Sequence, residues 1–88
     1  MENPLIEYDR NLEYCTNDLY FAAFLLCVGC RKTRVIKKKT IFYFLFDNQV
    51  NTVKQLQKDY FNHDAKVSPL KYKSCLKDLR DEMNLIGR

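Results

Sequence analysis

The chain has 88 residues, 47% of them hydrophobic and 30% charged, and its formal net charge is +4. This length provides one small domain, and the balance of apolar and charged residues is typical of a globular protein rather than a disordered one. The only glycines, Gly29 and Gly87, lie far apart, which excludes the glycine-rich loops of P-loop and dinucleotide-binding enzymes. We expect one domain over 12–88, preceded by a loosely ordered arm over 1–11.

The first half of the chain predicts a helix followed by a hairpin. Residues 12–14 alternate in polarity and leave open a short N-terminal strand. Asp18 is a suitable N-cap for an apolar helix over 18–28, which Gly29 ends. Residues 31–36 and 40–46 are predicted to form an antiparallel hairpin, because the second run is β-branched and aromatic.

The second predicted strand has two apolar faces. Ile41, Tyr43 and Leu45 alternate with Phe42, Phe44 and Phe46. Because side chains of a strand point alternately to opposite faces, we expect one face to pack on helices and the other to meet a different surface.

Two more helices are predicted over 49–62 and 69–84, the last of them starting at Ser68 and Pro69. The resulting order, (β)-α-β-β-α-α, predicts an α+β fold in which three helices pack on a small antiparallel sheet.

Charge is distributed unevenly along the chain. Residues 1–30 contain one basic and five acidic residues, for a net charge of −4. Residues 31–46 contain no acidic residue and six basic ones, which are Arg31, Lys32, Arg34, Lys37, Lys38 and Lys39. We expect these six side chains to project outward from the hairpin, without carboxylate partners, and to create a local positive field.

The basic hairpin predicts a non-enzymatic module that binds nucleic acid, or a complex that handles nucleic acid, by neutralising phosphates. Tyr43 is a candidate for stacking on bases if its face of the sheet is open. Lys71, Lys73 and Lys77 of the last helix are expected to support the same contact.

Other interpretations remain open. The lysines of the hairpin can simply keep an edge strand soluble. An open aromatic face and a basic patch also suit an inhibitor or adaptor that occupies an acidic surface of another protein, and such a face leaves a homodimer open.

No pattern predicts an enzyme or a bound cofactor. Cys27 and Cys30 form a C-x-x-C motif, but at the C-terminal end of a predicted helix, where the helix dipole disfavours a thiolate. Cys15, Cys75 and the single histidine, His63, lack the spacing of a zinc site. A thiol redox or metal protein is therefore the third interpretation, with no metal ligand assigned.

The sequence predicts a cytoplasmic protein without membrane contact. The N-terminus has no basic segment ahead of an apolar run, as a secretory signal would. The longest apolar stretch, residues 19–30, has 12 residues, whereas a membrane-spanning helix needs about 20.

Several core and capping residues resemble a family of small uncharacterised bacterial and phage proteins, described as a domain of unknown function. The resemblance covers about residues 12–83 and implies a phage or mobile-element accessory protein. It implies no catalytic residues. The residues that carry it are Tyr14, Thr16 to Tyr20, Ala22 to Leu26, Gly29, Phe44, Phe46, Asp47, Asp59 to Asn62, Val67 and Pro69.

Overall fold

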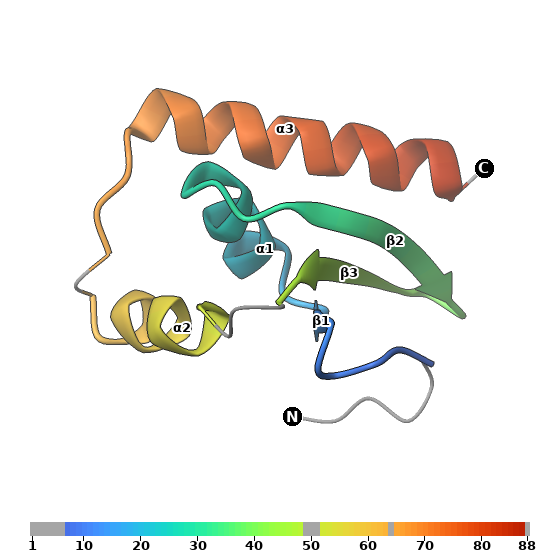
Figure 1. Cartoon of the computed structure of the whole chain (residues 1–88). Coiled ribbons are helices and arrows are strands. Elements are labelled where there is room, and N and C mark those ends of the chain that lie inside the picture. Colours follow the sequence, from blue (N-terminus) through green and yellow to red (C-terminus); the bar gives the residue numbers. More distant parts are fainter. Residues whose placement is uncertain (1–6, 49–51, 64, 88) are drawn as a thin grey trace.

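The computed structural model of the chain describes residues 7–48, 52–63 and 65–87. It confirms the α+β fold and the predicted order, including the short N-terminal strand. The elements are β1 (Glu13–Thr16), α1 (Leu19–Cys27), β2 (Lys32–Lys38), β3 (Ile41–Asp47), α2 (Val53–Phe61) and α3 (Pro69–Ile86) (Figure 1).

β3 is the central strand of the sheet. The strand order is β1-β3-β2, and both neighbours run antiparallel to β3. Tyr14 of β1 lies opposite Phe46, and Val35 of β2 lies opposite Phe44. A central strand that is covered on both faces needs apolar residues at every position, which explains the unbroken apolar sequence of β3.

The main core lies between one face of the sheet and the helices. α1 is apolar on nearly all sides because it packs against α2 and α3 as well as the sheet. The largest fully buried side chains of this core are Phe21 and Leu25 of α1, Phe44 and Phe46 of β3, Val53 of α2 and Leu79 of α3.

The opposite face of the sheet is also closed. Tyr43 is 2% exposed and Leu45 is fully buried. Tyr8, Cys15 and Ile36 pack against these two side chains. Tyr8 belongs to the described part of the predicted arm, residues 7–11, which therefore lies against the sheet; residues 1–6 lie outside the described residues. An open aromatic face, on which the candidacy of Tyr43 for base stacking depends, is absent from the described structure.

The helix ends follow local capping chemistry. The Asp18 carboxylate accepts hydrogen bonds from the backbone amides of Tyr20 and Phe21, at 3.0 and 3.1 Å. Ser68 caps α3, which runs two residues beyond its predicted end at 84. The first three residues of the predicted helix 49–62 lie outside the described residues. No helix within the described ranges is long and apolar enough to cross a membrane.

The turn between β2 and β3 is tighter than predicted. Lys37 pairs with Phe42 and Lys38 with Ile41, so both lysines belong to β2, and the predicted strand end at 36 is wrong. Only residues 39 and 40 form the turn. Lys39 adopts a left-handed conformation, with φ of +58°, which permits a two-residue turn without glycine at some steric cost.

Candidate nucleic-acid interface

A β-bulge at Thr33 divides the basic residues of β2 between the two faces of the sheet. Lys32 lies opposite Phe46 and Arg34 lies opposite Leu45, so Thr33 is an extra residue in β2. Because side chains of a regular strand alternate, the extra residue places Arg34 on the face away from Lys32. The basic residues therefore do not form one continuous surface.

On the helix-covered face, two lysines of β2 lie close to α3. Lys32 Nζ forms an ion pair with Glu82 Oε1. Lys37 Nζ lies 5.6 Å from the centre of the Phe42 ring, near Gly87 at the C-terminal end of α3. The carbonyl dipoles at a helix C-terminus favour a nearby cation, but they do not cancel its full charge. Lys32 is neutralised, whereas Lys37 keeps most of its field.

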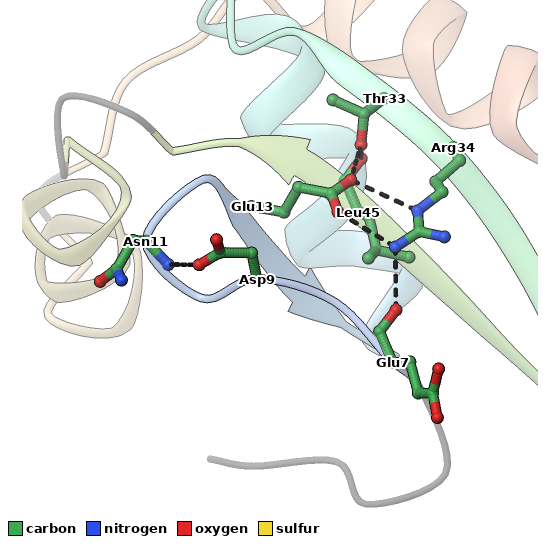
Figure 2. Close-up of polar contacts among 7 residues, drawn as sticks. All are labelled: Glu7, Asp9, Asn11, Glu13, Thr33, Arg34 and Leu45. Atoms are coloured by element: carbon green, nitrogen blue, oxygen red, sulfur yellow. Dashed lines mark hydrogen bonds and ion pairs between the residues drawn. The ribbon is translucent and has the colours of Figure 1, made fainter.

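On the opposite face, Arg34 is held by the N-terminal part of the chain (Figure 2). Its Nη2 lies 3.0 Å from Glu13 Oε1 and its Nε lies 3.4 Å from Glu13 Oε2. Nη2 also donates a hydrogen bond to the backbone carbonyl of Glu7, at 3.0 Å. The prediction that all six basic side chains lack carboxylate partners is therefore wrong for Lys32 and Arg34.

The remaining positive charge of the hairpin is concentrated at its end. We define the hairpin tip as Lys37, Lys38 and Lys39, which are all exposed. In the described part of the chain, none of the three pairs with a carboxylate. Arg31 is also exposed, but it lies before β2 and lines a cavity of about 580 Å³ beside the end of α1 and the start of α2.

The predicted support from α3 lies at a distance from the hairpin tip. Figure 1 shows the turn between β2 and β3 at the same end of the molecule as the C-terminus of α3. Lys71, Lys73 and Lys77 lie in the first half of α3, so the helix rise separates Lys73 from Gly87 by about 21 Å. Lys77 is also paired with Asp81, at 2.8 Å. These lysines are therefore not an extension of the hairpin tip.

Tyr43 does not offer a stacking surface in this structure. Its side chain is 2% exposed and faces the cluster with Leu45. A base can stack only on an accessible ring face. Tyr43 is therefore left out of the candidate interface.

Three of the cysteines, Cys15, Cys30 and Cys75, are not activated nucleophiles. Burial raises the pKa of the Cys15, Cys30 and Cys75 thiols, so each keeps its proton to higher pH than an exposed thiol. Cys27, the last residue of α1, is buried in the structure. Within the described residues, no three His, Cys, Asp or Glu side chains are grouped as a metal site requires.

Two acidic residues, Glu13 and Glu82, determine which cations of the hairpin remain accessible, and neither was predicted from the sequence to pair with the hairpin. They lie 21 and 50 residues away from Arg34 and Lys32, respectively. The net charge of −4 in residues 1–30 was the one available signal for Glu13. Glu82 carries no such signal, because α3 contains several acidic residues among its lysines.

Comparison with curated proteins and with solved structures finds no match. A family model, described as a domain of unknown function (DUF5659), matches residues 11–85. This range includes all of the strands and helices described above except the last residue of α3. The chain belongs to the DUF5659 family.

Proposed function

We propose that the chain is a non-enzymatic module that binds the phosphate backbone of nucleic acid through its hairpin tip. The observation that carries this proposal is the presence of three consecutive exposed lysines, Lys37 to Lys39, without a carboxylate partner among the described residues. Each phosphate contact by a lysine releases counterions, so three adjacent lysines provide a strongly salt-dependent attraction.

The chemistry of the tip favours backbone contacts over base recognition. Lysine is a compact point charge without the rigid fork that reads base edges. The aromatic side chains of β3 are buried or half-buried, which leaves little ring surface for stacking. We therefore expect binding that depends weakly on sequence, with duplex bound at least as tightly as a single strand because of its higher charge density.

The free thiols and the family resemblance indicate in which compartment and in which biological context the protein acts. All four cysteines are free, as is usual in a reducing compartment, so we place the protein in the cytoplasm. The resemblance to bacterial and phage proteins favours a role as an accessory protein of a phage or mobile element.

A fluorescence-anisotropy titration with a labelled 20-base-pair duplex tests this proposal at several salt concentrations. Replacing all three tip lysines with glutamine is expected to weaken binding about tenfold or more at low salt. It should also make the slope of log affinity against log salt shallower by about 2.7. The matched control replaces the exposed lysines Lys54, Lys58 and Lys66, which removes the same charge elsewhere and should have a smaller effect. Equal losses in both variants, or no binding by the wild type at 50 mM salt, would contradict the proposal.

One observation favours a second candidate, a protein adaptor or inhibitor. Tyr20, Phe61 and Leu70 are 51, 56 and 79% exposed. The hydrogen bond from the Tyr72 hydroxyl to the Tyr20 carbonyl and the ring contact between Phe21 and Phe61 bring their elements together. A contiguous exposed apolar patch is typical of a protein interface, and we infer that these three side chains contribute to one.

A pull-down from nuclease-treated lysate distinguishes the two candidates. Recovery of a stoichiometric protein that is lost on Phe61→Ser but kept when the tip lysines are replaced would establish the adaptor instead.

A further inference from the structure

The bulge in β2 brings two hydrogen-bonding side chains together on one side of the sheet. Thr33 and Arg34 are consecutive residues, and in a regular strand they would point to opposite faces. Here both reach the same carboxylate, that of Glu13 in β1 (Figure 2). β-bulges commonly redirect a side chain beside a functional site.

The contacts around Glu13 have the geometry of an oxyanion site. The Thr33 hydroxyl donates a hydrogen bond to Glu13 Oε2 at 2.5 Å, and Arg34 approaches the two carboxylate oxygens through Nε and Nη2. A planar guanidinium binds carboxylates and phosphates with the same two-pronged arrangement. The carboxylate of Glu13 therefore stands where two oxygens of a phosphate group would be held.

The site is accessible on the side of the arginine. The Arg34 side chain is 43% exposed, whereas that of Glu13 is 18% exposed. The Thr33 hydroxyl also lies 3.1 Å from the carbonyl oxygen of Leu45, which provides an alternative acceptor when Glu13 moves away. Because the arginine of this ion pair is exposed to solvent, the pair is weak enough for another anion to displace its acidic member.

We propose that Thr33 and Arg34 form a second phosphate-binding site, which Glu13 occupies in the free protein and which a phosphate of bound nucleic acid takes over. This inference rests on the proposed function, because the incoming phosphate belongs to the same nucleic acid as the one held by the hairpin tip. Glu13 competes with the phosphate for Thr33 and Arg34 and so lowers the affinity for nucleic acid. Once Glu13 is displaced, this site and the hairpin tip bind the same nucleic acid together.

The spacing along β2 suits one continuous nucleic-acid strand. Arg34 and Lys38 lie opposite Leu45 and Ile41, respectively, on the same face of the sheet. Four residues of strand separate them by about 13 Å. Arg34 and Lys38 can therefore contact different phosphates of the same nucleic-acid strand, because successive charges of a strand follow at short intervals.

The duplex titration tests the site with Glu13→Gln, which keeps the shape of the side chain and removes its charge. We expect binding about fivefold tighter than that of the wild type, which is the strength of an exposed ion pair. The control is Asp81→Asn, which removes the same charge and frees Lys77 on α3; its effect should be less than twofold. Arg34→Lys in the Glu13→Gln background keeps the positive charge but removes the planar, two-pronged guanidinium. This second change should abolish the tighter binding of Glu13→Gln.

A tighter complex in Glu13→Gln that Arg34→Lys reverses supports the site. Equal affinities of Glu13→Gln and Asp81→Asn would overturn it, and so would a gain that persists in Arg34→Lys. If wild-type binding depends on the tip lysines in either of these cases, the proposed function stands while the second site fails.

A separate measurement tests whether Thr33 and Arg34 bind phosphate, even if the protein does not bind nucleic acid. The Arg34 Nε–H signal is followed by NMR in Glu13→Gln during titration with inorganic phosphate, and with chloride at equal ionic strength. A saturable shift with phosphate alone supports the site, whereas equal responses to the two anions refute it.

Discussion

The two faces of the sheet are covered in different ways. One face packs against α1 and α3 in a core with several large aromatic and aliphatic side chains. Among the described residues, the other face buries Tyr43 and Leu45 beneath a smaller group that includes Tyr8 from the N-terminal segment. Hydrophobic stabilisation is roughly proportional to the apolar area buried, so most of the stability of the fold should come from the helix-covered face.

The same contrast applies to the ion pairs on the two faces. Lys32 is held by Glu82 of α3, an element of the main core, whereas Arg34 is held by Glu13 and by the backbone of Glu7. A contact made by a short terminal strand and the segment before it can open without disturbing the main core. The face covered by the N-terminal segment is therefore the one that can change on binding while the fold persists.

The contributions of the two faces to stability are compared most directly by truncating adjacent residues of β3 that point to opposite faces. Phe44→Ala is expected to lower the free energy of unfolding by about 3–5 kcal/mol, because it opens a cavity within the helix-covered core. Leu45→Ala should cost about 2 kcal/mol, since the thinner cover can collapse into the space. Urea unfolding followed by circular dichroism measures both values. A Leu45→Ala cost equal to or above that of Phe44→Ala would show that the faces contribute equally.

The cover of the second face is tested by removing its aromatic side chain. Tyr8→Ala should cost about 1 kcal/mol, because Tyr8 is only half-buried. It should also accelerate hydrogen exchange at the amides of Leu12 and Glu13, which donate to the Asp9 carbonyl, and leave α1 protected. Tyr20→Ala is the control, since Tyr20 is 51% exposed and its loss should be nearly neutral. Accelerated exchange throughout α1 would mean that the two faces unfold together.

The two ion pairs allow a finer comparison. Glu13→Gln should destabilise the protein by about 0.5–1 kcal/mol, because Glu13 interacts with both Thr33 and Arg34. Glu82→Gln removes a single-point contact with Lys32 and should cost about 0.3 kcal/mol. Thermal unfolding at low and high salt measures both, and added salt should narrow the difference. A larger cost for Glu82→Gln at both salt concentrations would reverse the ranking.

Local patterns were sufficient to predict the elements of the fold. Asp18, Gly29, Ser68 and Pro69 mark helix ends through short-range backbone chemistry, and the structure places the ends of α1 and the start of α3 within a residue or two of the prediction. The apolar residues on both faces of β3 likewise indicated that one face packs on helices, whereas they left open whether the other face is covered. These features depend on neighbours in the sequence, which a single chain displays directly.

The candidate site was harder to predict because it depends on register and on distant partners. One extra residue at Thr33 changes the face to which Arg34 points, and no residue type in this segment marks a bulge. Without the bulge, Arg34 and Lys32 would share a face, and Glu13 would not reach the guanidinium. The burial of Tyr43 was hard to predict for a related reason, since it depends in part on Tyr8, 35 positions earlier in the chain.

The smallest expected effect concerns the thiol on the face covered by the N-terminal segment. Burial raises the pKa of Cys15, and the negative charge of Glu13 raises it further, while Arg34 lowers it. An unfolded thiol titrates near its ordinary pKa of 9.0, so the native state holds this proton to higher pH than the unfolded state does. The resulting stabilisation is complete below that value and is lost as the pH rises through the native pKa.

We therefore expect Cys15→Ala to lose less stability than the wild type between pH 8 and pH 10, as measured by urea unfolding at both values. Its packing cost is present at both pH values and cancels in this comparison. Glu13→Gln removes the nearby negative charge, so the Cys15 pKa should fall, and alkylation of Cys15 by iodoacetamide should begin at lower pH. An unchanged alkylation profile would mean that Glu13 does not act on this side of β1, and would separate the thiol from the Glu13–Arg34 pair.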